Sequence, residues 1–379
     1  MIVKLTGRID STNASAVEET LNQEINGFSG EIILDASGLE YISSAGLRVI
    51  LRIKKSNPDT KIINCKLDVY EIFDMTGFTE MMEISKAYRE ISIEGCEVIG
   101  EGANGIVYRT DPDTIVKLYK NPDSLADIQH ERELARKAFV MGIPTAIPYD
   151  VVKVGDLYGS VFELLNAKSF AMLIREGANV EQLAKESVDI LKIIHSTTLK
   201  PGELPNKKEE VLKWAEFAKP YLSAEVYEKV MKLVKEVPDT NTMLHGDYHI
   251  KNIMKQNNEN LLIDMDTLAL GHPIFEFSEI YGAYLGYSCI DKNNSAAFLG
   301  IERDQCHDLW KYTLKYYFEG RDEDFIKEVE RKAAFISYLH IFRWMVRRFG
   351  LDDPYASQVS AYCLNFINEN VKTLDSLWF

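Results

Sequence analysis

The sequence predicts two folded parts, a small α/β domain followed by a larger α+β domain with two lobes. Three observations support this fold class. Strand-like and helix-like segments alternate up to about residue 90, strand patterns surround one helix from Ile91 to Glu163, and helical spacing dominates beyond about Ala167. A chain of 379 residues is also long enough for two or three separate hydrophobic cores.

The first part alternates two apolar patterns. A period of two residues is typical of a half-buried strand, and a period of about 3.6 residues is typical of an amphipathic helix. This part has no glycine-rich loop of its own. We expect strands at Val3–Ile9, Glu31–Asp35 and Lys61–Cys65, and helices at Ala14–Ile25, Ala45–Lys55 and Leu67–Asp74.

The second part begins after a break near Arg89–Cys96. We place the domains at residues 1–91 and 92–379, and the two lobes of the second domain at 92–165 and 166–379. A crevice between two lobes is a common place for a ligand. The expected strands are Ile91–Ile99, Gly105–Arg109, Thr114–Tyr119, Val151–Val154 and Gly159–Glu163, with a helix at Leu125–Met141 and a hairpin turn at Asn257–Asn260.

Composition and charge exclude several classes of protein. Apolar residues make up 46% and charged residues 27%, as in ordinary globular proteins, and the net charge of −15 argues against nonspecific nucleic-acid binding. The five cysteines form no C-x-x-C pair, so we expect neither a disulfide framework nor a zinc site. No apolar run reaches the roughly 18 residues of a membrane span, and Met1 leads into a strand pattern. We therefore expect a cytoplasmic protein without nucleic-acid or membrane partners.

Leu244–Asp266 carries the residues that point most directly to chemistry. Asp247 precedes Asn252 by five residues, and a hydrophobic strand then leads to Asp264. This layout suits phosphoryl transfer, in which one carboxylate meets the attacking hydroxyl while an amide and a second carboxylate hold Mg²⁺. We expect Asp247 to orient the acceptor hydroxyl and accept its proton, Asn252 and Asp264 to bind Mg²⁺, and Asp266 to support that ion.

Three histidines are candidate site residues. His245 and His249 form H-x-x-x-H, but the Gly-Asp-Tyr between them does not favour a helix, so we do not expect a metal site there. We expect His245 to brace the loop through hydrogen bonds and His249 to be partly exposed. His195 lies near a predicted helix end, where we expect a structural role.

The segment from Gly100 to Val107 matches G-x-G-x-x-G-x-V, with the other glycines at Gly102 and Gly105. A dinucleotide-binding fold also uses such glycines, but it needs a helix directly after them. Here β-branched and aromatic residues follow, which predicts a hairpin whose backbone N–H groups can approach phosphates. A simple tight hairpin without a ligand is the alternative.

Lys117 is the one charged residue within an apolar strand pattern, I-V-K-L-Y. A phosphate-binding lysine at this place is paired with a glutamate on the next helix. Glu131 and Glu133 are both on that helix but cannot share a face. We favour Glu133 as the partner, with Glu131 as the second choice. Alternatively, Lys117 is an edge-strand lysine and Glu133 a solvated residue.

Residues from about 93 to 379 resemble the aminoglycoside phosphotransferase and choline kinase-like family, which has a protein kinase-like fold. The matching motifs are H-G-D-x-x-x-x-N at His245–Asn252 and I-D-x-D at Ile263–Asp266. The resemblance implies ATP or GTP and Mg²⁺ as cofactors, and a hydroxyl group on a small molecule or protein as the acceptor. It also implies nucleotide contacts at Glu163 and Leu165.

A downstream segment departs from the family pattern. Gly271–Phe277 resembles G-D-P-x-x-D-L, with His272 and Glu276 in place of the two aspartates. We read Glu276 and the nearby Glu279 as solvated surface, although they could attract a cationic substrate. The aromatic residues of the C-terminal helices, such as Tyr284, could stack on an acceptor but more often form core.

Residues 1 to about 90 resemble a STAS domain, the fold of bacterial anti-sigma factor antagonists. The matching segments include Leu5–Asp10, Tyr41–Arg48 and Ile72–Phe78. In that family a serine before the A-G-L or S-G-L turn is phosphorylated, and Ser44 holds this position. The resemblance implies an anti-sigma factor or another STAS-binding partner. Alternatively, Ser43 or Ser44 only caps the helix that follows.

Three functions are therefore compared. The first is an ATP- and Mg²⁺-dependent phosphotransferase with a regulatory or docking STAS module. The second is a protein serine kinase in a partner-switching system, acting on Ser44 or on a partner STAS protein. The third is a nucleotide-binding signalling scaffold without turnover. The retention of Lys117, Asp247, Asn252 and Asp264 argues against it.

Overall fold

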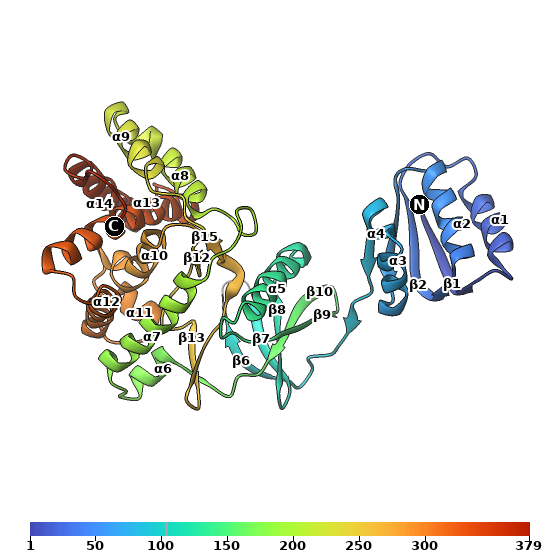
Figure 1. Cartoon of the computed structure of the whole chain (residues 1–379), viewed down its shortest axis with the longest axis horizontal. Coiled ribbons are helices and arrows are strands. Elements are labelled where there is room, and N and C mark those ends of the chain that lie inside the picture. The colour runs from blue at the N-terminus through green and yellow to red at the C-terminus, as the bar shows by residue number, and fades with distance from the viewer. Residues whose placement is uncertain (103–104) are drawn as a thin grey trace. The chain divides into compact units, whose positions relative to one another are not determined.

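The computed structural model describes residues 1–102 and 105–379, and Figure 1 shows the course of the chain. Two compact units are present, each with its own hydrophobic core. The first contains Met1–Glu94 together with Val151–Gly159, and the second contains Gly95–Asp150 and Ser160–Phe379. Among the described residues, no helix has both the length and the apolar content needed to cross a membrane.

The first unit is built on a four-stranded parallel sheet in the order β1-β2-β3-β4. Parallel neighbours need crossover connections, which the helices between the strands supply. The α/β prediction is therefore confirmed. The strands are β1 (Ile2–Ile9), β2 (Ile32–Ile42), β3 (Thr60–Cys65) and β4 (Ile84–Lys86), and the helices are α1 (Ala14–Ile25), α2 (Ser44–Ser56), α3 (Leu67–Met75) and α4 (Phe78–Met81).

Strand β2 is longer than predicted, because it continues past Asp35 to Ile42. The Ala-Ser-Gly sequence after Asp35 looks like a turn, but it pairs with an irregular stretch of β1 that contains two register shifts. A Cβ atom at Gly38 would lie 2.9 Å from Cγ2 of Thr6, so glycine permits the close approach of the two strands there.

Helix α2 begins at a well-defined cap. The Ser43 side chain accepts hydrogen bonds from the backbone N–H of Ala45, at 3.2 Å, and of Gly46, at 3.5 Å. Ser43 is therefore the N-cap residue. Ser44, the first residue of the helix, is exposed.

Lys117 lies on β8, in a six-stranded sheet. The sheet order is β5-β9-β10-β8-β7-β6, and helix α5 (Leu125–Val140) follows β8. The predicted strand Ile91–Ile99 is wrong, because Gly95 lies in a turn with a φ of 76° that separates β5 from β6. The strands are β5 (Arg89–Glu90), β6 (Glu97–Glu101), β7 (Gly105–Asp111), β8 (Thr114–Tyr119), β9 (Pro148–Val154) and β10 (Leu157–Glu163).

The C-terminal lobe is mainly helical (Figure 1). It contributes most residues of the larger core. The long helix α13 packs against both α10 and α14. Tyr284 and Trp310 are buried, and Phe277 contacts the rings of Trp310, Tyr317 and Phe318, so these aromatic residues form core. The helices are α6 (Phe170–Arg175), α7 (Val180–Ser196), α8 (Lys207–Ala218), α9 (Ala224–Lys235), α10 (Ile274–Tyr284), α11 (Asn294–Leu299), α12 (Arg303–Tyr317), α13 (Glu323–Phe349) and α14 (Pro354–Asn370).

Short strands in this lobe frame the Leu244–Asp266 segment. β12 pairs antiparallel with β15, and β13 forms a hairpin with β14. Gln256 pairs with Glu259, so the predicted turn between these two strands is present but spans only residues 257–258, because Glu259 and Asn260 already belong to β14. The elements are β11 (Lys168–Ser169), β12 (Met243–Leu244), β13 (Ile253–Gln256), β14 (Glu259–Leu262), the 3₁₀ helix η2 (Met265–Thr267) and β15 (Ala269–Leu270).

Candidate active site

The loop after β12 turns sharply at Gly246. Its φ of +84° lies in the left-handed region, and a Cβ atom at this position would lie 2.2 Å from the carbonyl oxygen of Thr267. Only glycine fits such a conformation and such a close approach. The turn therefore brings the residues after β12 close to η2.

The Glu276 side chain stabilises this loop by binding its backbone. Its carboxylate accepts hydrogen bonds from the backbone N–H of His245, at 2.5 Å, and of Gly246, at 3.0 Å. The side chain is fully buried, so our reading of Glu276 as solvated surface is wrong. The family pattern, which has an acidic residue at this place, was the signal that could have identified it. His195 also lies 3.8 Å from this carboxylate and bonds to Tyr317, which agrees with a structural role.

Asp247 is joined to Asn252 within the loop. The Asn252 side-chain amide donates to the Asp247 backbone carbonyl, at 2.9 Å, and to Oδ2 of its carboxylate, at 3.2 Å. Burial opposes ionisation of Asp247, but the hydrogen bond with His249 and the neighbouring imidazoles outweigh it and hold the pKa of Asp247 well below its usual value. Asp247 is therefore ionised at neutral pH.

The predictions for the two loop histidines, His245 and His249, had different results. The His245 ring is buried and bonded to the carbonyl of Ile263, at 3.2 Å, and to the backbone N–H of Asp247, at 3.3 Å. The predicted bracing role is confirmed. His249 was expected to be partly exposed, but it is 5% exposed because its ring packs against Phe298 and its Nε2 lies 3.5 Å from Asp247.

Lys117 lies between two carboxylates. Its Nζ is 2.8 Å from Oε1 of Glu131 and 3.1 Å from Oδ1 of Asp264. Burial disfavours a charged lysine, but Asp264 and Glu131 more than compensate and raise the pKa of Lys117 above its usual value. The lysine is therefore a fixed positive charge that joins β8, α5 and the segment after β14.

Glu133 is not the partner of Lys117, and this prediction is wrong. Glu131 is on the buried face of α5, where its second carboxylate oxygen also accepts a hydrogen bond from the Tyr119 hydroxyl. Glu133 lies two residues further along the helix, on an exposed face. Residues two apart point in different directions, so only one of the two glutamates can reach the lysine.

Asp264 has an unusual backbone. Its φ of +66° is in the left-handed region, which non-glycine residues rarely adopt and which is typical of functional sites. The preceding residue, Ile263, donates its N–H to the backbone carbonyl of Asn252, at 3.0 Å, which ties the two predicted metal ligands together. In η2, burial and the charge of Asp264 raise the pKa of Asp266. Helix α5 packs against this segment.

The glycine-rich segment forms the predicted hairpin between β6 and β7. Gly100 lies on β6, and Gly102 donates its N–H to the carbonyl of Gly105 at 2.9 Å. A Cβ atom at Gly105 would lie 2.6 Å from the Leu118 carbonyl oxygen, so glycine is required there. Val107 pairs with Lys117 across β7 and β8. The remaining loop positions, Ala103 and Asn104, lie outside the described residues.

The residues expected to contact the nucleotide base lie at the end of β10 and directly after it. The backbone N–H of Glu163 donates to the carbonyl of Ile147, at 3.1 Å, and that of Leu164 donates to Asp113, at 2.8 Å. Leu165 is half-buried. The nucleotide contacts assigned to Glu163 and Leu165 stay predictions.

Each of the two parts of the chain matches the model of a known protein family. The model of the phosphotransferase enzyme family matches residues 95–305, and that of the STAS domain matches residues 1–91. A protein of Bordetella bronchiseptica named as an anti-sigma factor antagonist, BtrV, is 32% identical over 91 residues, which are 23% of this chain and 78% of that protein.

Solved structures show the same fold at low identity. A thermostable variant of aminoglycoside phosphotransferase APH(4)-Ia, in a ternary complex with AMP-PNP and hygromycin B, superposes with a TM-score of 0.52 at 12% identity, covering 74% of this chain and 95% of that one. A variant of aminoglycoside 2'-phosphotransferase-IIIa in complex with GDP gives 0.51 at 14% identity, covering 79% and 97%. The predicted kinase-like fold is confirmed, and the chain belongs to the phosphotransferase enzyme family, with a STAS domain at its N-terminus.

Proposed function

We propose that this chain transfers the terminal phosphoryl group of ATP or GTP to a hydroxyl acceptor, with the STAS domain as a regulatory or docking unit. One observation carries the proposal. Lys117, from one lobe, lies 3.1 Å from Asp264 of the other lobe, while Asp264 is tied through Ile263 to Asn252, which in turn bonds to Asp247. Phosphoryl transfer needs a cation, metal ligands and a hydroxyl-orienting carboxylate in one place.

The residues present fit a magnesium ion. Asn252 uses its NH₂ group to bond Asp247, so its amide oxygen can face an ion, and the Asp264 side chain is 42% exposed. Among the described residues no three His, Cys, Asp or Glu side chains form a metal cluster by themselves. Asn252, Asp264 and Asp266 would therefore hold Mg²⁺ together with water and nucleotide phosphates. When bound, Mg²⁺ neutralises the negative charge of the phosphates.

The other side chains have separate roles in this proposal. Asp247 is ionised and orients the acceptor hydroxyl, and because its pKa is low it accepts the proton late in the reaction. Lys117 binds the phosphates, and Glu131 keeps its ammonium group in place. The backbone of the β6–β7 hairpin covers the phosphates, beside Val107.

Turnover of nucleotide tests the proposal. ATP and GTP are each incubated with Mg²⁺ and a panel of hydroxyl compounds, with wild type, Asp247→Ala and Asp264→Ala. Wild-type turnover that exceeds that of both variants supports a phosphotransferase. Turnover no greater than that of the variants contradicts it, and nucleotide binding without turnover would instead favour the scaffold.

A second candidate function is a protein serine kinase that acts on Ser44 or on a partner STAS protein. The observation that favours it lies at the start of α2. Ser43 makes the cap hydrogen bonds there, and Ser44 is exposed. A phosphate on Ser44 would add nearly two negative charges at a helix N-terminus. Mass spectrometry after incubation with ATP, alone and with a partner STAS protein, tests it. Phosphate on neither protein would contradict this function.

A further inference from the structure

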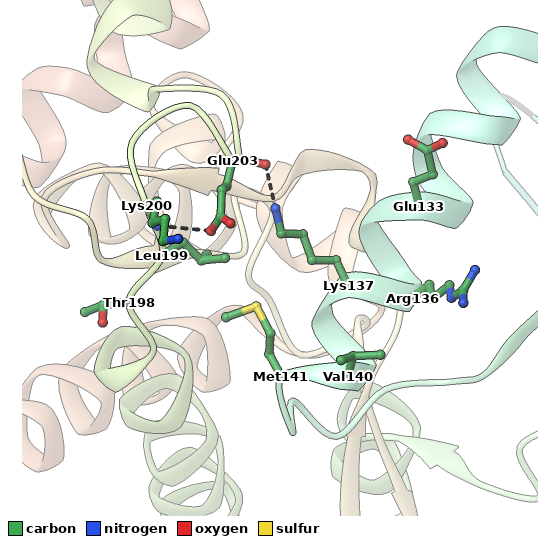
Figure 2. A pocket seen from close by; sticks show the side chains of 9 residues that line it. All are labelled: Glu133, Arg136, Lys137, Val140, Met141, Thr198, Leu199, Lys200 and Glu203. Atoms are coloured by element: carbon green, nitrogen blue, oxygen red, sulfur yellow. Dashed lines mark hydrogen bonds between the residues drawn. The ribbon is translucent and has the colours of Figure 1, made fainter. Parts of the chain in front are cut away.

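A groove of about 740 Å³ lies on the second unit, between helix α5 and the segment that follows α7 (Figure 2). The helix contributes Glu133, Arg136, Lys137 and Val140 to its lining. The segment opposite comes from the C-terminal lobe and contributes residues 198–200 and 203. The groove is therefore bounded by both lobes of the phosphotransferase domain.

The groove uses a face of α5 other than the face that serves the candidate active site. Glu131 lies on the buried face together with Ile128, and Glu133, two residues after Glu131, lies on the groove face. From Glu133 the groove face continues through Arg136, Lys137 and Val140, at the spacing that keeps residues on one side of a helix. Any restraint on the groove face therefore also acts on the helix that holds Glu131.

The groove lining includes apolar side chains. Val140 is 77% exposed, and Leu199 on the opposite side is 9% exposed. Met141 contributes further apolar surface to the lining.

Three cations, Arg136, Lys137 and Lys200, line the groove. Within residues 1–102 and 105–379, no ion pair involves Arg136, Lys137 or Lys200, although the chain carries a net charge of −15. The Lys137 ammonium donates to the neutral backbone carbonyl of Glu203, at 2.9 Å. Glu133 and the Glu203 carboxylate also line the groove, so the lining has one more cation than it has carboxylates. This excess matches a partner with acidic groups beside an apolar side chain.

We propose that the groove docks an acidic amphipathic segment of a partner protein, with an apolar side chain between Val140 and Leu199 and carboxylates paired with Arg136 and Lys200. Amphipathic helices bind grooves in this way, through apolar anchors at helical spacing. The occupant joins α5 to the segment 198–203, which the Lys137–Glu203 hydrogen bond already connects.

Docking has a consequence for the active site. Helix α5 carries Glu131, the partner of Lys117, and packs against η2, which contains Asp266. An occupant that fixes α5 against the C-terminal lobe favours the arrangement in which Glu131 holds Lys117, so it raises turnover. This regulatory step rests on the proposed phosphotransferase function, whereas the docking itself does not.

The test uses the full chain and a fluorescein-labelled synthetic peptide of about twelve residues, with leucines at helical spacing and glutamates elsewhere. Fluorescence anisotropy should show saturable binding. Val140→Asp should weaken it at least about tenfold, through the lost apolar contact, and Arg136→Glu about fivefold. The matched controls Met172→Asp and Lys213→Glu, exposed positions on α6 and α8, should leave affinity unchanged. Nucleotide turnover with and without peptide is measured in parallel.

Several results would overturn the proposal. These are no saturable binding up to about 1 mM peptide, equal binding of a counterpart peptide with lysine in place of glutamate, or equal binding by the two groove variants. Sedimentation showing a dimer that Val140→Asp abolishes would assign the groove to a second copy of the chain and would also overturn it. Peptide binding without a change in turnover would reject only the regulatory step. A chain without any turnover would contradict the proposed function, while the anisotropy result would still decide the docking.

Discussion

Two lysines of the second unit each lie between two carboxylates, yet their surroundings differ. Both ammonium groups are held at similar distances, and their carboxylate neighbours raise the pKa of each lysine against the effect of burial. Charge pairing alone therefore does not distinguish them. Lys117 lies 2.8 Å from Glu131 and 3.1 Å from Asp264, and Lys207 lies 2.9 Å from Glu210 and 3.1 Å from Glu279.

The surroundings separate a structural cluster from a candidate active site. Lys207 is 6% exposed and lies over the Trp214 ring, which stacks on His340, and His340 in turn bonds to Glu279 at 3.0 Å. The reading of Glu279 as solvated surface is therefore wrong. Asp264, beside Lys117, is 42% exposed in the same segment as Asp266. Glu210, the other partner of Lys207, is also exposed, so the difference lies in the centre of each site. The Trp214 and His340 rings and Glu279 close the centre of the Lys207 cluster, whereas Asp264 and Asp266 are both exposed in one segment beside Lys117.

Replacing Lys207 should have the largest effect on stability. Lys207→Met leaves Glu279 buried without its main cation, which costs about 3–5 kcal/mol of unfolding free energy. Urea denaturation measures this loss. Turnover per folded molecule should stay at the wild-type level, and a selective loss of turnover at unchanged stability would remove the distinction between the two lysines.

Replacing Lys117 should reduce turnover more than it reduces stability. Lys117→Met removes the cation that binds the phosphates, so turnover should fall about 10²–10³-fold, as for other lost contacts to developing charge. The cost in stability should be smaller than for Lys207→Met, because burial already raises the pKa of Glu131, so the carboxyl left behind takes up a proton more readily than Glu279 does and keeps its hydrogen bond with Tyr119. Steady-state kinetics and urea denaturation on the same preparation give both values, and wild-type turnover in this variant would contradict the assignment.

The Lys207 cluster should also make stability depend on acid. Burial opposes ionisation of Glu279, but Lys207 and His340 lower its pKa to about 2, from 4.5 in the unfolded chain. A lowered pKa stabilises the fold above pH 4.5, and this contribution of about 3 kcal/mol is lost as pH falls from 4.5 towards 2. The free energy of unfolding is measured by urea denaturation at several values between pH 6 and about 3. It should fall more steeply with decreasing pH in wild type than in Glu279→Gln. Identical slopes would show that Glu279 does not contribute.

The smallest expected effect is a change in turnover on replacing one of the two glutamates of α5. Glu131→Gln weakens the hold on Lys117, so turnover should fall about tenfold, which corresponds to about 1.4 kcal/mol. Glu133→Gln is the matched control on the exposed face of the same helix and should not change turnover. A loss in the Glu133 variant alone would restore the original prediction from the sequence.

Much of the fold could be predicted because its apolar patterns are regular. Thr114–Tyr119 has the predicted bounds, since β-branched and aromatic residues fill it. The end of β2 was missed because Ala-Ser-Gly usually marks a turn, and only the irregular pairing with β1 shows that Gly38 continues the strand.

The candidate site was predicted by motif rather than by packing. The order of Asp247, Asn252 and Asp264 along the chain is visible in the sequence, because a short loop and a hairpin bring them together. The choice between Glu131 and Glu133 depends on how α5 is rotated against β8, and helical spacing alone cannot supply that rotation. The burial of Glu276 depends likewise on contacts between distant segments.

A crystal structure of the chain with Mg²⁺ and a non-hydrolysable ATP analogue tests the central claim most directly. The account predicts an ion held by oxygens of Asn252 and Asp264 at about 2.1 Å, Lys117 on the phosphates, and Asp247 facing the terminal phosphate. A nucleotide bound elsewhere, or an ion that touches neither Asn252 nor Asp264, would contradict it.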